Sequence, residues 1–302
     1  MDRYQTVVER VAETGRVAML IGGLDSGKTS LGCAIASAAL AAERTVGYLD
    51  ADLGQKSIGP PTAVTVKMFR HAEEFPASAS RQAGTLGEPD AMSFVGSTSP
   101  QGQLLPLVVG TARMLAEAEA AGADLVVVDT SGFVSGVYGQ LLKYHKVELL
   151  QPDVVIGLQR GEELDPLLGI IRRFFDTEVV ALPVPTEVVS TSVDDRAQGR
   201  EAAFRSYFAE PLQRWRVKPT VFMPALPALF EPDQLDRILV GLSDGQGTTL
   251  GMGYLEYSAD EGVLRLISPA AEAPKALKLG SARLDPDFRV RRVDLRNLFG
   301  TD

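Results

Sequence analysis

The sequence predicts a three-layer α/β domain with a mainly parallel sheet, followed by a small β-rich domain. Short apolar runs, typical of strands covered on both faces, alternate with helical segments between residues 17 and 182. A glycine-rich turn separates the first of these runs from the helix that follows it. Beyond residue 219 the alternation gives way to short runs separated by turn residues. We therefore expect a first domain over residues 1–219 and a second over residues 220–302.

The composition is compatible with a globular protein of two domains. The chain has 302 residues, of which 45% are hydrophobic and 23% are charged. No apolar run reaches the ~18–20 residues of a membrane span, and the N-terminus lacks the order of a signal peptide, so we expect a cytoplasmic protein without a membrane partner. One cysteine and two histidines rule out an internal disulfide and a multi-cysteine or histidine-rich metal centre. The net charge of −9 argues against broad nonspecific binding to nucleic acids, but it leaves room for a local basic groove.

The individual elements follow from the hydrophobic pattern and the turn residues. Valines at helical spacing predict a short amphipathic helix over residues 3–14 that ends at Gly15. The rest of the first domain is predicted to contain strands at residues 17–21, 45–52, 64–69, 124–130, 153–158 and 178–182, helices at residues 30–40, 104–121, 138–150 and 164–175, a strand with a tight turn at residues 93–102, and an irregular segment at residues 73–90. In the second domain, turn signals at Asp244-Gly245 and Asp260-Glu261-Gly262 predict hairpins. The strand-like runs there are residues 248–257, 262–267, 276–284 and 290–295.

The glycine-rich turn carries the strongest chemical signal. Residues 22–29 fit the phosphate-loop pattern G-x-x-x-x-G-K-[ST] without a mismatch, between a predicted strand and a predicted helix. In this geometry backbone N–H groups and the helix N-terminus attract phosphates. Lys28 is expected to reach the β- and γ-phosphates and Thr29 to offer its hydroxyl to Mg²⁺. The residues expected to contact a nucleoside triphosphate are Gly22, Gly23, Leu24, Asp25, Ser26, Gly27, Lys28, Thr29 and Ser30.

Further polar residues are placed where they can act on the bound phosphates. Asp50 and Asp52 come at the carboxyl end of a predicted strand, where ligands of open α/β sheets bind, and a period of two puts both on one face if the strand stays extended that far. Of the two, Asp50 is expected to have a structural role. Gln55 follows in the next loop, where it either contacts the ligand or braces the loop. Arg196 and Arg200 are four residues apart and share one face of a helix. That face either covers the phosphates or is solvated and pairs with the neighbouring carboxylates of Asp194, Asp195 and Glu201.

Four segments together resemble the polynucleotide 5′-hydroxyl kinases of RNA processing, a family that includes a pre-mRNA cleavage-factor kinase and a pre-ribosomal-RNA processing kinase. The phosphate loop is the first, and the run D-A-D-L-G-Q at residues 50–55 is similar to the acidic strand end of that family. Residues 94–100 resemble its substrate-holding clasp, and Arg196 to Arg200 resemble its R-x-x-x-R lid. The resemblance spans roughly residues 17–285. The eukaryotic members carry an additional N-terminal domain, so the early phosphate loop is similar to a compact prokaryotic form.

The resemblance implies a kinase that uses ATP and Mg²⁺ to phosphorylate the 5′-hydroxyl end of RNA or DNA. It implies that Lys28 and the loop hold the triphosphate, that Thr29 and Asp52 hold the metal, and that Asp52 is the base. Arg196 and Arg200 would close over the phosphates as a lid near residues 190–208. The residues implied to contact the terminal nucleotide are Gln55, Thr98 and Pro100.

Several alternatives stay open at the level of the sequence. Asp52 can instead hold Mg²⁺ only through water, and Thr98 and Pro100 can belong to an ordinary β-turn. Asp129, a second acidic strand end, suits either the metal surroundings or a helix cap. For the whole protein, the alternatives are a regulatory or assembly NTPase that acts on a protein partner, and a small-molecule kinase. The sequence names no protein partner and leaves the choice between RNA and DNA open.

Overall fold

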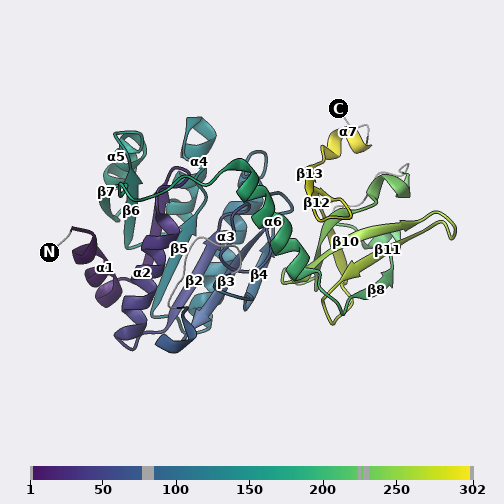
Figure 1. The fold of residues 1–302 in the computed structure, drawn as a ribbon, viewed down its shortest axis with the longest axis horizontal. Coiled ribbons are helices and arrows are strands. Elements are labelled where there is room, and N and C mark those ends of the chain that lie inside the picture. The colour runs from purple at the N-terminus through teal and green to yellow at the C-terminus, as the bar shows by residue number, and fades with distance from the viewer. Residues whose placement is uncertain (1–2, 77–84, 224–225, 227–230, 300–302) are drawn as a thin grey trace.

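The first of two β-sheets is mixed and mainly parallel. The computed structural model describes residues 3–76, 85–223, 226 and 231–299, and in these residues the first sheet has seven strands in the order β4-β3-β2-β5-β1-β6-β7 (Figure 1). Its strands are β1 (Val17–Gly22), β2 (Val46–Ala51), β3 (Ala63–Phe69), β4 (Ala91–Phe94), β5 (Leu125–Thr130), β6 (Val154–Gln159) and β7 (Glu178–Pro183). Along the order β2-β5-β1-β6-β7 neighbouring strands are parallel. The strand β3 pairs antiparallel with both β2 and β4. The predicted fold class is confirmed.

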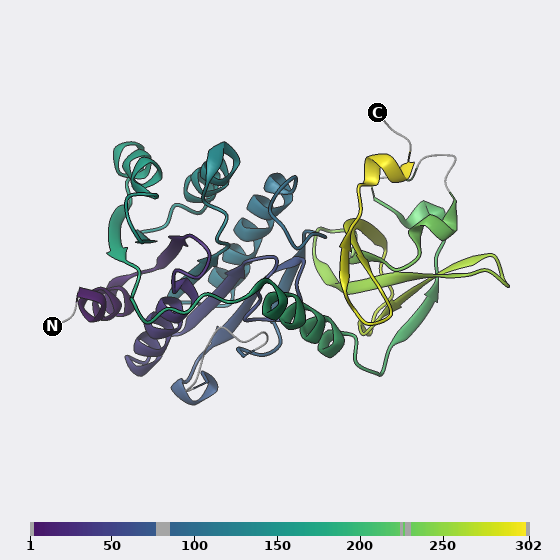
Figure 2. The ribbon, with the colours of Figure 1, turned by 45° about the horizontal axis from the view of Figure 1, so that its top comes forward.

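Helices cover both faces of this sheet, as Figure 2 shows. The helices are α1 (Arg3–Thr14), α2 (Lys28–Ala41), α3 (Leu104–Ala120), α4 (Gly136–Leu150) and α5 (Asp165–Phe174). Leu20 and Val127 pack towards α1 and α2, whereas Met19 and Val128, their neighbours in sequence, pack towards α3, α4 and α5. Because successive strand residues point to opposite faces, central strands of a three-layer domain are apolar throughout. This explains why the strands of the first domain were predictable as continuous apolar runs.

The second sheet is antiparallel. Over the described part of the chain it has six strands in the order β13-β12-β9-β10-β11-β8. They are β8 (Gln213–Arg216), β9 (Ile238–Ser243), β10 (Thr249–Ser258), β11 (Val263–Ser268), β12 (Ala276–Leu284) and β13 (Val290–Arg292). The predicted hairpins are present, with Gly245 and Gly262 at φ of 80° and 63° in their turns. Since β8 pairs with β11, the second sheet starts before the boundary expected at residue 219.

Short helices complete the chain. Single 3₁₀ turns are η1 (Ala72–Glu74), η2 (Pro219–Val221) and η3 (Pro232–Leu235), and a last short helix is α7 (Leu295–Phe299). The strand predicted to extend to residue 295 therefore ends at Arg292. Residues 77–84 of the irregular segment predicted at residues 73–90 lie outside the described residues. No helix in the described ranges has the length and apolar character needed to cross a membrane.

A single helix, α6 (Val193–Tyr207), connects the two sheets (Figure 1). Ser192 caps its first turn by accepting a hydrogen bond from the N–H of Asp195 at 3.0 Å. At its other end Phe204 is fully buried in an apolar cluster with residues of β9, β10 and β12. The N–H of Met252 in β10 donates to the hydroxyl of Tyr207 at 2.8 Å. The end of α6 is therefore fixed to the second sheet, while its start reaches the loop after β1.

Candidate active site at the carboxyl edge of the first sheet

The phosphate loop joins β1 to α2 and leaves open space where an anion would bind. Gly27 has a φ of 89°, in the left-handed region, immediately before the first residue of α2. A Cβ atom added at Gly23 would meet nothing within 4 Å, and one added at Gly27 would meet only Val188, at 3.6 Å. The start of α2 also supplies partial positive charge at this point. The loop of this chain therefore fits the phosphates of a nucleotide.

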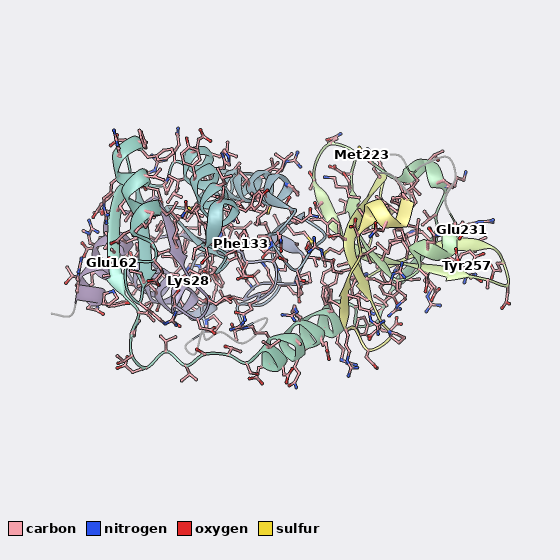
Figure 3. The ribbon with its side chains drawn as sticks, turned by 90° about the horizontal axis from the view of Figure 1, so that it is seen from above. Lys28, Phe133, Glu162, Met223, Glu231 and Tyr257 are labelled. Atoms are coloured by element: carbon pink, nitrogen blue, oxygen red, sulfur yellow. The ribbon has the colours of Figure 1, made fainter. Side chains whose placement is uncertain are left out.

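Lys28 lies over this loop. Its Nζ donates hydrogen bonds to the carbonyl oxygens of Gly22 at 3.0 Å and Gly23 at 2.7 Å, and to Ser26 Oγ at 3.3 Å. The side chain is largely buried. Figure 3 shows Lys28 in the same part of the molecule as Phe133, which lies in the turn after β5. The ammonium group is thus held at the mouth of the loop, on carbonyl oxygens that phosphate oxygens can replace.

Thr29 and Asp129 form a second feature of the loop region. Thr29 Oγ1 donates to Asp129 Oδ2 at 2.6 Å. Asp129 is in β5, which lies between β1 and β2 in the sheet. Burial raises the pKa of this carboxyl group to about 6. A hydroxyl and a carboxylate are the hard oxygen ligands that Mg²⁺ prefers. The donor set therefore fits this metal, although the described residues contain no group of three or more histidine, cysteine, aspartate or glutamate side chains placed to hold one alone.

Asp50 and Asp52 have different surroundings, because the strand does not stay extended as far as Asp52 and the condition for a shared face is not met. Asp50 is buried and pairs with Lys56, whose Nζ is 3.0 Å from Asp50 Oδ1. Asp50 also accepts the N–H groups of Asp52 and Ser57, so it fixes the loop rather than facing a ligand. The strand β2 ends at Ala51, and Asp52 lies beyond it. Its Oδ1 accepts N–H groups from Gly54 at 2.8 Å and Gln55 at 3.1 Å, which orients the carboxylate.

Two adjoining pockets collect most of the predicted residues. The phosphate pocket is lined by Leu24, Asp25, Lys28, Thr29, Asp52, Gln55, Ser57, Asp129, Thr130 and Gly132. The lid pocket is lined by Gly54, Gln55, Lys56, Pro61, Thr191, Asp195, Arg196, Gly199, Arg200 and Ala203. Gln55 belongs to both, so it lies between the phosphate loop and α6. Ser30 is exposed on α2 and lines neither pocket.

Thr98 and Pro100 are also absent from the lining of these two pockets. The carbonyl oxygen of Thr98 lies beside Gly54, where it would be 2.9 Å from an added Cβ atom. The carbonyl oxygen of Pro100 accepts the N–H of Gln103, which closes a turn. The clasp itself is held by the second sheet, since the N–H of Ser281 in β12 donates to the carbonyl oxygen of Gly96 at 2.8 Å. The clasp therefore lies between the loop that carries Asp52 and Gln55 and strand β12 of the second sheet.

The two lid arginines differ in their contacts. Arg196 forms an ion pair with Asp25 of the phosphate loop, with Nη2 2.6 Å from Oδ2. Among the described residues it does not pair with Asp194, Asp195 or Glu201, the neighbours that the solvated alternative requires. Arg200 lines the lid pocket, and burial together with the charge of Arg196 lowers the pKa of its guanidinium group. The lid helix therefore presents two arginines to the site in different ways, one through Asp25 and one directly at the lid pocket.

Sequence reasoning assigned no specific role to three basic residues near the phosphate pocket. Lys143 Nζ donates to Thr130 Oγ1 at 2.8 Å and to the carbonyl oxygen of Ser131 at 2.7 Å. Lys146 is fully buried, and its Nζ has no hydrogen-bond partner among the described residues. Arg160 Nη2 donates to the carbonyl oxygen of Asp25 at 2.6 Å. The only signal in the sequence is that two lysines stand three residues apart on a helix that packs against the core.

Comparisons with known proteins agree with this geometry. Residues 22–210 match the family described as mRNA cleavage and polyadenylation factor CLP1 P-loop. The chain is 34% identical to the polyribonucleotide 5′-hydroxyl-kinase of Pyrococcus furiosus, over 89% of this chain and 88% of that protein. It is 26% identical to the polyribonucleotide 5′-hydroxyl-kinase of Methanocaldococcus jannaschii, over 88% and 86% of the two chains.

A solved structure is similar in fold. The structure of a wild-type Clp1p–Pcf11p complex matches 92% of this chain and 77% of that chain with a TM-score of 0.69 and 15% identity. The residues that match the family include the phosphate loop, both strands that carry acidic residues and the lid helix. The resemblance stated from four short segments is confirmed over most of the chain. The protein belongs to the mRNA cleavage and polyadenylation factor CLP1 P-loop family.

Proposed function

We propose that this protein is an ATP- and Mg²⁺-dependent kinase that phosphorylates the 5′-hydroxyl end of a polyribonucleotide. The observation that carries the proposal is the phosphate pocket, in which Lys28, Thr29 and Asp52 lie together beside the lid pocket with its arginines. Relatives at 34% and 26% identity over most of the chain bear the name polyribonucleotide 5′-hydroxyl-kinase. Both the pocket and the relatives support phosphoryl transfer to an alcohol of a nucleic acid.

The triphosphate is bound by the phosphate loop. Lys28 exchanges its hydrogen bonds to the carbonyl oxygens of Gly22 and Gly23 for phosphate oxygens, and the amides at the start of α2 complete the cradle. Thr29 and Asp129, which share a hydrogen bond in this pocket, are the residues that would hold Mg²⁺. When bound, the metal neutralises charge on the phosphates and orients them. The protein thereby fixes the γ-phosphate in line with the acceptor.

Asp52 acts as the base in this proposal. Its Oδ1 is held by two backbone amides, and the carboxylate lines the phosphate pocket. A carboxylate fixed in this way can accept the proton of the 5′-hydroxyl as that oxygen bonds to the γ-phosphorus and the bond from this phosphorus to ADP breaks, so that ADP leaves. Arg200 supplies positive charge at the lid pocket, where it offsets the charge of the transferring group, while Arg196, which lines the same pocket, is paired with Asp25.

The acceptor approaches from the side of the lid pocket. Gln55 lines both pockets, which supports a contact to the terminal nucleotide. Thr98 and Pro100 contribute through the clasp, whose backbone lies beside Gly54. Because the clasp is held by the second sheet, the acceptor site depends on both parts of the chain.

Transfer of radiolabel from γ-labelled ATP to an oligoribonucleotide with a 5′-hydroxyl tests the proposal. We expect label on the oligonucleotide, none on the same oligonucleotide with a 5′-phosphate, and none with the variant Lys28→Ala. A matched oligodeoxyribonucleotide compares RNA with DNA in the same assay. Release of free phosphate without labelled oligonucleotide would contradict the kinase and favour an NTPase that acts on a protein partner.

A further inference from the structure

Asp25 places a carboxylate within the loop that binds phosphates. It is 7% exposed and has a φ of 52°, in the left-handed region that few residues other than glycine and asparagine or aspartate adopt. It also lines the phosphate pocket. A negative charge here opposes the binding of a triphosphate unless a cation compensates it. The loop therefore needs a positive partner for Asp25.

The start of the lid supplies that partner. Arg196 Nη2 lies 2.6 Å from Asp25 Oδ2, and the side chains are 19% and 4% exposed. The N–H of Thr191, two residues before α6, donates to the same oxygen at 3.1 Å. Arg160 binds the carbonyl oxygen of Asp25 from the loop after β6. The side chain of Asp25 is thus the point at which the lid is attached to the phosphate loop.

Arg200 lies one turn further along α6. It lines the lid pocket and forms no hydrogen bond or ion pair with a residue that the structure describes. The far end of α6 is fixed by Phe204 and Tyr207 on the second sheet. A helix held at both ends fixes the position of the residues between them. Arg200 is therefore available to a ligand, and the attachment at Asp25 sets where it lies.

We propose that Asp25 is a positioning residue of the lid: through Arg196 it anchors α6 on the phosphate loop, and Arg196 in turn cancels the charge of Asp25. The inference rests on the proposed function and gives the two arginines different roles. Arg196 acts on the nucleotide through Asp25, whereas Arg200 contacts the transferring phosphoryl group.

If Arg196 compensates the charge of Asp25, removing Asp25 as well should restore nucleotide binding to an Arg196 variant. Direct binding of the phosphates by Arg196 predicts no such recovery. Removing one partner of a largely buried ion pair leaves an uncompensated charge, whereas removing both does not. Arg196→Gln removes the guanidinium partner of the Asp25 carboxylate, which lines the phosphate pocket. The double variant Asp25→Asn with Arg196→Gln removes that carboxylate as well. Asparagine tolerates the left-handed backbone of position 25, so the loop conformation is retained.

The experiment measures the dissociation constants of ADP and of a non-hydrolysable ATP analogue with Mg²⁺, by calorimetry on the full chain. For Arg196→Gln we expect the dissociation constant to rise by roughly ten- to a hundred-fold. The double variant should regain most of the lost affinity. Arg196→Lys, which keeps the charge, should bind nearly as well as the unmodified protein. A double variant that binds as weakly as Arg196→Gln would overturn the proposal, because Arg196 would then act on the phosphates directly.

The positioning role is tested by turnover. Asp25→Asn should slow phosphorylation of the oligonucleotide more than it weakens nucleotide binding, because Arg200 loses its fixed place. Adding Asp25→Asn to Arg200→Gln should then cause little further loss, since both changes act on one interaction. Fully multiplicative losses would contradict a role through Arg200. If the unmodified protein phosphorylates no oligonucleotide, the proposed function fails, but the calorimetric comparison still decides whether Arg196 compensates Asp25.

Discussion

At the scale of single residues, Asp52 is the group whose role is most open to a direct test. One carboxylate oxygen is committed to the backbone of Gly54 and Gln55. Asp52→Asn keeps an oxygen that can accept both N–H groups, so the loop is preserved while the proton acceptor is lost. We expect the transfer rate in a single turnover to fall by the ~10²–10⁴-fold typical of a lost general base, with little change in nucleotide affinity. An unchanged rate rules out the base, and a parallel loss of Mg²⁺-dependent nucleotide affinity would assign Asp52 to the metal.

Lys146 is a second residue with a measurable consequence. Burial lowers the pKa of its ammonium group to about 7 from 10.5, with the carboxylates of Asp52, Asp50 and Asp129 opposing the shift and Lys56 adding to it. The unfolded chain therefore binds a proton that the folded chain gives up between pH 7 and pH 10.5. Since stability rises with pH wherever the unfolded state binds more protons, the destabilisation by Lys146 is greatest below pH 7 and fades towards pH 10.5.

Lys146→Met removes this titration and should stabilise the protein at pH 7. The gain in the free energy of unfolding should shrink by about 2 kcal/mol between pH 7 and pH 9. Urea unfolding at several pH values measures it, with Lys218→Met, at an exposed position, as the control. A gain that is independent of pH would show that lost packing or gained apolar contact, rather than the buried charge, dominates.

These residues also show which features of the site could be predicted from the sequence and which could not. The placement of Lys28 and Thr29 at the end of the loop was predictable, because covalent spacing fixes it within the motif. The surroundings of Asp129 and Lys146 were not, because the order β2-β5-β1 and the packing of α4 bring them to the site from far along the chain. The pairing of Asp25 with Arg196, 171 residues apart, was hidden for the same reason.

At the scale of elements, the sequence predicted that α6 exists. It did not predict that α6 is attached to the second sheet and to the phosphate loop. The R-x-x-x-R spacing and the resemblance indicated a lid near residues 190–208, and the helix spans Val193–Tyr207. Its fixed end depends on long-range contacts: Phe204 is fully buried against the second sheet. A helix with few buried residues of its own is stabilised mainly by such contacts. The position of the lid is therefore a property of the packing between parts of the chain.

Phe204→Ala tests this attachment. The loss of a buried phenylalanine should reduce the free energy of unfolding by about 3–5 kcal/mol, and the loosened helix should also slow turnover. Val193→Ala on the same helix is the matched control, because Val193 is 75% exposed and its truncation should change stability by less than about 0.5 kcal/mol. Chemical unfolding and initial rates report the two effects. Equal stabilities of the two variants would show that α6 is not held by the second sheet.

At the scale of the whole molecule, the backbone of the clasp closely approaches the backbone of β12 in the second sheet. A Cβ atom added at Gly96 in the clasp would lie 2.5 Å from the Cα of Gly280 in β12. Gly280 is equally confined, since its own added Cβ atom would lie 2.9 Å from the carbonyl oxygen of Gly96. The sequence predicted two parts and the turns of the second, but a contact between two glycines leaves no hydrophobic pattern to read. The clasp also meets the second sheet through Phe94, which lies in one apolar cluster with Leu239 and Met252.

Gly96→Ala should therefore disturb the acceptor side of the site and spare the nucleotide side. Gly122→Ala is the matched control, because the φ values of Gly96 and Gly122 are 82° and 84° and a Cβ atom at Gly122 would meet nothing within 4 Å. Both variants bear the strain of a left-handed alanine, about 1 kcal/mol, and only Gly96→Ala adds a clash with backbone that cannot yield cheaply. We expect Gly96→Ala to lose several-fold more thermal stability and to raise KM for the oligonucleotide, while its affinity for ADP stays close to that of Gly122→Ala. Matching losses in the two variants would mean that backbone strain alone is responsible, and that the clasp does not need the second sheet to hold the acceptor.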